Sequence, residues 1–115
     1  MPDIQKLTRK VIAFRDAREW KQFHNPKDVA ISLCLEAAEL LEHFQWKDGA
    51  ETARHVKKCR TEVSEELADV LYWVLLLGHD LDINLDKALS RKLVKNAKKY
   101  PVSKARGRHT KYNNL

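Results

Sequence analysis

Two pairs of carboxylates stand where the chain otherwise has the composition of a buried core. Glu36 and Glu39 lie within one long apolar stretch, and Glu66 and Asp69 lie at the head of another. Residues three apart share one face of a helix, so each pair presents its carboxylates side by side. A buried carboxylate is costly unless it is paired or binds a metal. The spacing therefore predicts that the two pairs face each other and hold a metal ion.

The chain has the size of one domain, with few of the residues that form tight turns. It has 115 residues, with three glycines and three prolines, which disfavours an all-β fold. The longest mainly apolar run, 67–78, is shorter than the roughly 20 residues that span a bilayer. The residues after Met1 show no signal-peptide pattern, and Cys34 is interpreted as a small core residue. We therefore expect a cytoplasmic protein without a membrane segment.

Hydrophobic periodicity predicts an α-helical bundle. Helical spacing of apolar residues, with Asn25-Pro26 and Asn84 as helix starts, predicts four helices over about 3–18, 26–46, 62–81 and 84–100. Thr61 is expected to cap the third helix and Gly49 to end the second. Residues 50–60 are predicted to form a short surface helix or loop. We expect residues 1–101 to form one domain and 102–115 a basic tail that is extended or loosely packed.

The second and third predicted helices are apolar nearly all round. Such helices are buried, and a bundle of one chain leaves part of their surface uncovered. Oligomerisation would supply the missing burial. The same helices carry the two carboxylate pairs.

Ligand chemistry favours Mg²⁺, with Mn²⁺ as a possible substitute, over a redox metal. Hard, oxygen-only ligands suit these two ions. The competing di-iron bundle uses Glu-x-x-His motifs, whereas Glu36 and Glu66 are followed at that spacing by Glu39 and Asp69. His43 stands one turn further on. Because Mg²⁺ is commonly shared with substrate phosphates, the carboxylates point to phosphate chemistry.

The positive charge of the chain gathers towards its end. The net charge is +6, which favours an anionic partner or simply a solvated basic surface. Lys92, with Lys95 or Lys99, is a candidate for contacting phosphates. Aromatic residues that flank the second helix could stack on a nucleobase, although tryptophans more often lie in a core or interface; they are Trp20, Phe23, His24 and Trp46.

The motifs resemble those of a known family. Glu36-Ala-Ala-Glu39 and Glu66-Leu-Ala-Asp69 resemble the ExxE…ExxD signature of the MazG-like all-α nucleotide pyrophosphohydrolases. Further segments resemble its dCTP pyrophosphatase branch, so that the similarity covers about 15–112; they are Trp20-Lys-Gln-Phe-His24, Phe44-Gln-Trp-Lys47, Asn96-Ala-Lys-Lys-Tyr-Pro101 and Lys111-Tyr112.

This resemblance implies an activity and a set of site residues. It implies a helical bundle assembled as an intertwined dimer or dimer of dimers, which hydrolyses a nucleoside triphosphate between its α and β phosphates to the monophosphate and pyrophosphate. The implied Mg²⁺ ligands are Glu36, Glu39, Glu66 and Asp69, one of which, or Glu65, orients the attacking water. The implied base and sugar pocket consists of Trp20, Lys21, Gln22, Phe23, His24 and Trp46. The implied phosphate contacts are Lys92 and Asn96, with Tyr100 closing the site.

The chain departs from that branch at Val11, where a His is common, and at Trp73, where a Tyr is expected. Both departures leave the preferred base open. The implied role is house-cleaning of the nucleotide pool, by removal of dCTP or modified deoxynucleotides.

Two other functions compete with hydrolysis. A non-catalytic basic helical module would bind nucleic acid or a protein partner through the late lysines and arginines, with an affinity that falls steeply with salt. Acidic residues inside apolar helices would repel nucleic acid, which weighs against that partner. A regulatory bundle without catalysis would have no need of all four carboxylates.

Overall fold

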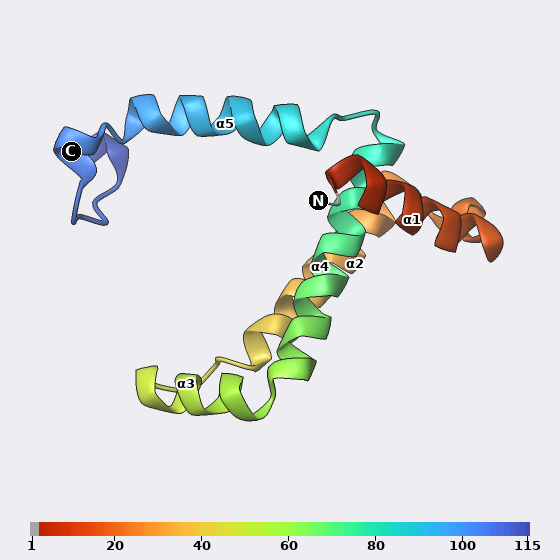
Figure 1. Cartoon of the computed structure of the whole chain (residues 1–115), viewed down its shortest axis with the longest axis horizontal. Helices are drawn as coiled ribbons and strands as arrows, with labels where there is room; N and C mark the ends of the chain where they lie inside the picture. The colour runs from red at the N-terminus through yellow and green to blue at the C-terminus, as the bar shows by residue number, and fades with distance from the viewer. Residues whose placement is uncertain (1–2) are drawn as a thin grey trace. The chain divides into compact units, whose positions relative to one another are not determined.

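The computed structural model describes residues 3–115, and throughout that range the regular structure is helical (Figure 1). This confirms the predicted all-α class. The α-helices are α1 (Ile4–Ala17), α2 (Pro26–Glu42), α3 (Gly49–Lys58), α4 (Arg60–Asp80), α5 (Leu85–Lys99) and α6 (Val102–Ala105). Two short 3₁₀ turns are η1 (Trp20–Phe23) and η2 (Tyr112–Asn114).

The helices fall into two compact units. The N-terminal unit ends at Asp82 and contains α1 to α4. The C-terminal unit, Ile83–Leu115, contains α5, α6 and η2. The compact units thus divide before α5, and the separation of a 1–101 domain from a 102–115 tail stays a prediction.

The N-terminal unit is organised around the antiparallel pair of α2 and α4, with α1 packed on α4 (Figure 1). Its buried apolar side chains are Val29 on α2 and Val63, Leu75 and Leu76 on α4. The two helices run in opposite directions, and in their register Glu36 and Glu39 of α2 lie beside Glu66 of α4. This register is what positions the site.

Side-chain caps start most of the helices. Asn25 and Asn84 accept backbone N–H groups at the starts of α2 and α5, as the sequence predicted. Asp48 does the same for α3, so Gly49 begins a helix and the expectation that it ends one is wrong. Thr61 is not a cap either, because α4 already begins at Arg60, directly after α3.

The end of α2 also differs from the prediction. The helix stops at Glu42 and continues as turns through Trp46, which has a left-handed φ of 68°. Trp46 is consequently outside the helix and 90% exposed. A left-handed residue cannot continue a right-handed helix.

Two further expectations are corrected. Cys34 is exposed and not a core residue, because the surface of α2 around it is uncovered within the described chain. The tail is folded and not extended: α6 follows α5, and the ring of Tyr112 meets Tyr100 edge-on at 6.0 Å. The Lys99 ammonium lies 4.6 Å from the centre of the Tyr112 ring, so a cation–π contact helps to hold the tail.

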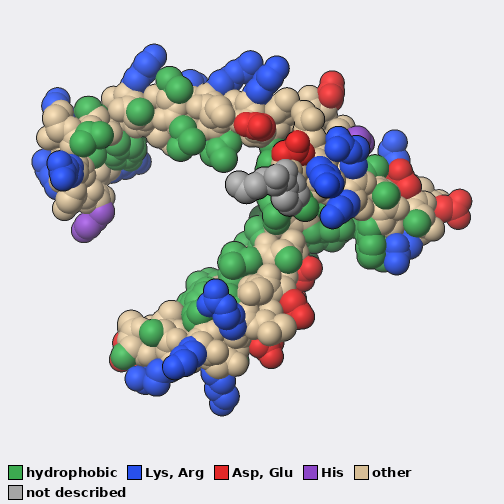
Figure 2. Space-filling view, in the orientation of Figure 1, with side chains coloured by type: hydrophobic (Ala, Val, Ile, Leu, Met, Phe, Trp, Pro, Cys, Tyr) green, Lys and Arg blue, Asp and Glu red, His purple; other side chains and the backbone are tan. Residues whose placement is uncertain are grey.

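Both units leave large apolar side chains in solvent. On α2 and α4 these include the i, i+4 pairs Ile31 and Leu35, and Leu67 and Leu71. On α5, one side is hydrophobic and the other carries lysines and arginines (Figure 2). Large apolar side chains exposed together in this way are typical of surfaces that contact a partner. No helix within residues 3–115 is long and apolar enough to cross a membrane.

A pair of histidines links the end of α2 to α3. His43 Nδ1 and His55 Nε2 lie 2.8 Å apart, so one proton is shared between the two nitrogens. Burial lowers the pKa of His55, assisted by the charges of Lys47 and His43 and opposed by Glu62. On acidification the unfolded chain therefore takes up more protons than the folded one. Stability is lost as the pH falls through the ordinary histidine pKa of 6.5.

We predict that His55→Gln reduces this loss of stability in acid, because the variant has no proton to take up at that position. Thermal unfolding of both proteins between about pH 8 and about pH 5 measures it. His109→Gln, at an exposed position of the C-terminal unit, is the control. The same pH dependence in wild type and His55→Gln would contradict the prediction.

Candidate metal centre and adjoining pocket

Three carboxylates from the two central helices come together. Glu36 and Glu39 of α2 and Glu66 of α4 each place a carboxylate oxygen within 4.8 Å of the others. The i, i+3 spacing puts the two α2 side chains on one face, and the antiparallel register sets α4 against that face. Like charges at this separation repel one another, so a positive charge placed among them would stabilise the cluster.

Two oxygens of this cluster are buried without a hydrogen-bond partner among the described residues. They are Glu36 Oε2 and Glu66 Oε2. Burial raises the pKa of Glu36 to about 7, with further contributions from a hydrogen bond to Glu39 and from the charges of Glu39, Asp69 and Glu66. Burial and the charge of Glu39 likewise raise the pKa of Glu66. Oxygen ligands that are short of both a donor and a cation fit a hard divalent ion.

The fourth predicted carboxylate, Asp69, lies beside the cluster. Together with Glu36 it lines a cavity of about 470 Å³, a volume typical of small-molecule sites. The cavity is formed between α1, η1, α2 and α4, and its other lining residues are Lys10, Val11, Phe14, Trp20, Tyr72 and Trp73. Glu36 thus belongs to both the carboxylate cluster and the pocket.

Aromatic rings form much of the pocket wall. Phe14 of α1 meets Trp20 of η1 at 5.9 Å and Tyr72 of α4 at 6.2 Å, both edge-on. Tyr72 in turn meets Trp73 at 5.0 Å. Edge-to-face contacts of this kind fix the orientation of each ring. A wall of aromatic rings next to carboxylates can hold a flat ring beside a metal-bound anion.

The chain is similar to a known protein family along most of its length. The model of the MazG-like family matches residues 31–115. The chain belongs to the MazG-like family. Its curated relatives include dCTP pyrophosphatase 1 of Rattus norvegicus, which is 35% identical over 99% of this chain and 68% of that protein. The Homo sapiens protein of the same name is 33% identical, with the same coverage.

A solved structure supports the MazG-like fold directly. A pyrophosphatase from Archaeoglobus fulgidus matches with a TM-score of 0.80 and 42% sequence identity. The match covers 84% of this chain and 91% of that one. The similarity therefore covers most of the helical framework.

The residues predicted to form the base and sugar pocket take different positions in the structure. Trp20 lines the cavity, and the ring of His24 meets that of Trp73 at 5.5 Å, with His24 Nδ1 buried and unpartnered among the described residues. Gln22 instead donates to the carbonyl of Glu19. The remaining predicted residues are exposed and outside the cavity lining; they are Lys21, Phe23 and Trp46.

The predicted phosphate-contacting residues lie in the C-terminal unit. Lys92 on α5 is exposed, Asn96 is half-buried, and the carbonyl of Asn96 accepts the backbone N–H of Tyr100. Their roles towards a substrate stay predictions.

The pocket includes three residues that sequence reasoning did not place there. Phe14 stands at helical spacing within the first predicted helix, a pattern that does not separate a pocket wall from a core, and Lys10 precedes it by one turn on the same side. Tyr72 stands in the apolar part of the third predicted helix, where the same ambiguity holds. Val11 and Trp73, where the chain departs from the dCTP pyrophosphatase branch, both line the pocket.

We predict that Glu36→Gln stabilises the metal-free protein above neutral pH. The folded carboxyl holds its proton up to a pKa of about 7, against an ordinary 4.5, so its ionisation removes stability as the pH rises through this range. At about pH 8 the variant should therefore unfold at a higher temperature than wild type, and at about pH 4 at the same temperature. Added Mg²⁺ should stabilise wild type more than the variant.

Glu42→Gln is the matched control, because Glu42 is an exposed residue at the end of the same helix and outside the cluster. An equal Mg²⁺ effect on Glu36→Gln and wild type would contradict the prediction.

Proposed function

We propose that this MazG-like chain is a Mg²⁺-dependent nucleotide pyrophosphohydrolase. It cleaves a (deoxy)nucleoside triphosphate between the α and β phosphates and releases the monophosphate and pyrophosphate. The substrate that we propose is dCTP or a modified dCTP. The observation that carries the proposal is that Glu36 belongs to the carboxylate cluster and also lines the aromatic pocket. The names of the relatives support the same reaction.

The carboxylates that would hold Mg²⁺, or Mn²⁺ in its place, are Glu36, Glu39, Glu66 and Asp69. When bound, the metal supplies positive charge to the phosphate oxygens and lowers the pKa of bound water. The buried, unpartnered oxygens of Glu36 and Glu66 fit this task. Without a cation, the carboxylates would repel the polyphosphate.

The nucleoside side of the substrate would occupy the aromatic pocket. Unpaired bases are commonly held by stacking on aromatic rings, and Phe14, Trp20 and Trp73 offer such rings beside Asp69. The further assignments of Lys21, Gln22, Phe23, His24 and Trp46 to the base, and of Lys92, Asn96 and Tyr100 to the phosphates, remain part of the proposal.

A carboxylate of the cluster would orient the attacking water. Glu65 was an alternative for this role, but it lines a separate depression with Thr61 and Ser64. The cluster's own carboxylates lie closer to the pocket and therefore serve this role better. The cellular role that follows is removal of unwanted deoxynucleotides in the cytoplasm.

Product analysis across a panel of nucleoside triphosphates with Mg²⁺ tests the proposed reaction. We expect pyrophosphate and the monophosphate from wild type. Glu39→Gln should reduce turnover by at least about a hundredfold while the helical content is retained, because one metal-binding charge is lost. Glu42→Gln should leave turnover unchanged.

The ranking of substrates in this panel identifies the preferred base. If no nucleotide is turned over with Mg²⁺ or Mn²⁺, the reaction is wrong, and binding of nucleic acid or a protein partner becomes the leading function. Full activity of Glu39→Gln would overturn the ligand assignment alone.

A second copy of the chain is proposed to cover the exposed apolar faces of α2 and α4. We predict a homodimer or homotetramer, whose mass in light scattering is a multiple of 13.4 kDa. Leu35→Glu should dissociate it, because a charge would be buried at the contact. Ala53→Glu, at an exposed position of α3, is the control for the added charge. A monomeric wild type would contradict this assembly.

A further inference from the structure

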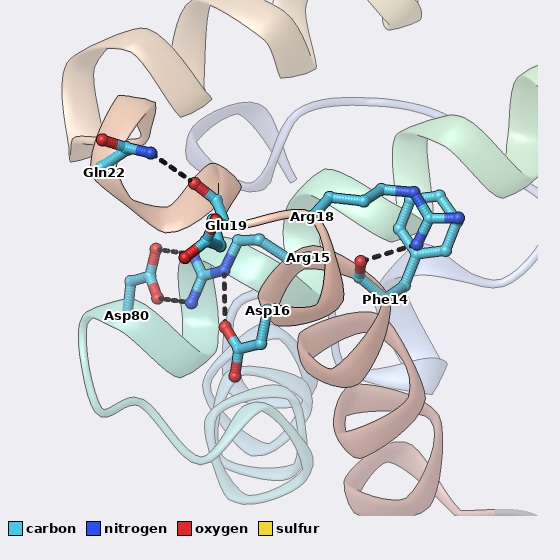
Figure 3. A network of polar contacts seen from close by, with 7 residues as sticks. All are labelled: Phe14, Arg15, Asp16, Arg18, Glu19, Gln22 and Asp80. Atoms are coloured by element: carbon cyan, nitrogen blue, oxygen red, sulfur yellow. Dashed lines mark hydrogen bonds and ion pairs between the residues drawn. The ribbon is translucent and has the colours of Figure 1, made fainter.

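The most deeply buried charge in the N-terminal unit belongs to Arg15, whose side chain is 1% exposed. Its guanidinium forms a two-bonded fork with Asp80, with Nη1–Oδ2 at 2.8 Å and Nη2–Oδ1 at 2.9 Å (Figure 3). Asp80 is the last residue of α4. The fork therefore ties the C-terminal part of α1 to the end of α4.

Arg15 depends almost entirely on this one partner. Its Nε is buried without a hydrogen bond, and the next carboxylate, Asp16, lies 3.9 Å from Nε and is 57% exposed. The hydrogen bonds to Arg15 lower the pKa of Asp80, so both groups stay charged at neutral pH. Buried ion pairs often add little net stability relative to apolar residues of the same volume, because desolvation is costly. Their planar geometry does fix position and orientation.

The Arg15–Asp80 fork lies close to residues of α1 and α4 that form the pocket wall. Phe14, the residue before Arg15, lines the cavity, as do Lys10 and Val11 one turn earlier on α1. On α4, Tyr72 and Trp73 precede Asp80 by about two turns and line the same cavity.

A second cation completes this arrangement. The Arg18 guanidinium lies 3.7 Å from the centre of the Phe14 ring and donates to the Phe14 carbonyl at 2.9 Å (Figure 3). The ring of Phe14 therefore contacts both Arg18 and Tyr72, while the next residue along the chain, Arg15, is tied to α4. A shift of α1 on α4 would move this ring directly into or away from the cavity.

We propose that Arg15 and Asp80 are a positioning pair for the nucleoside pocket. Their fork holds α1 at one distance from α4 and thereby sets where Phe14 and Tyr72, whose rings meet edge-on, stand in the wall of the cavity. No hydrogen bond or ion pair among the described residues joins this pair to the carboxylate cluster, so we expect it to act on nucleoside binding. The substrate part of this inference rests on the proposed function.

Asp80→Asn and Arg15→Lys test the pair by steady-state kinetics. Asp80→Asn removes the charge and weakens the fork, and we expect KM for the preferred triphosphate to rise about tenfold with kcat within about twofold. Arg15→Lys keeps the charge but loses the planar fork, and should give a smaller rise in KM. Asp16→Asn, next to the same guanidinium but exposed, should leave both constants unchanged.

Inorganic tripolyphosphate separates the pocket from the phosphate site. Its inhibition constant should be the same in wild type and Asp80→Asn, because it has no nucleoside. A rise of both KM and this constant, or a fall of kcat with KM unchanged, would show a general structural role and overturn the proposal.

Amide hydrogen exchange tests the pair without turnover. In Asp80→Asn, the amides of α1 should exchange faster, while those at the centres of α2 and α4 keep their protection. Unchanged exchange in α1 would overturn the proposal even if the enzyme is active. A wild type that hydrolyses no nucleotide would instead refute the proposed function, and the exchange of α1 would still decide whether the fork holds this helix.

Discussion

The structure depends on the antiparallel contact between α2 and α4, which brings like charges together inside the N-terminal unit. Glu36, Glu39 and Glu66 approach within 4.8 Å, and burial together with the neighbouring negative charges opposes the ionisation of Glu36 and Glu66. Folding tolerates this cost because the same contact buries apolar residues such as Val29 and Leu76. An arrangement that opposes folding at neutral pH and leaves carboxylate oxygens unpartnered is typical of a functional site.

The two ionic groups of the N-terminal unit differ in how completely they are satisfied. Arg15 and Asp80 neutralise each other through two short hydrogen bonds, so this pair requires no ligand. The carboxylate cluster has two buried oxygens without a partner among the described residues, and a cation from outside would neutralise its charge. The aromatic pocket lies on the helices that carry both groups, with Phe14 next to Arg15 and Glu36 in the cluster. One group can therefore set the shape of the site while the other supplies its chemistry.

The sequence predicted those features that depend on local spacing. The i, i+3 carboxylates and the caps Asn25 and Asn84 were found because a helix places such residues predictably. Gly49 was misjudged because the cap at Asp48 outweighs the tendency of glycine to end helices. The partnership of Arg15 with Asp80 joins residues 65 positions apart, and no local pattern marks it. The pocket roles of Lys10, Phe14 and Tyr72 were missed for the same reason, since apolar periodicity does not separate a pocket wall from a core.

The exposed apolar faces connect assembly with the chemistry of the site. Leu35 lies one residue before Glu36 on α2, and Leu67 lies one residue after Glu66 on α4. Covering these faces with a second copy would remove water from the neighbourhood of the carboxylates. Charge repulsion strengthens as water is excluded, so the assembled protein would need a cation more than the single chain does. Assembly and metal binding would then favour each other, because the metal offsets a cost that the subunit contact increases.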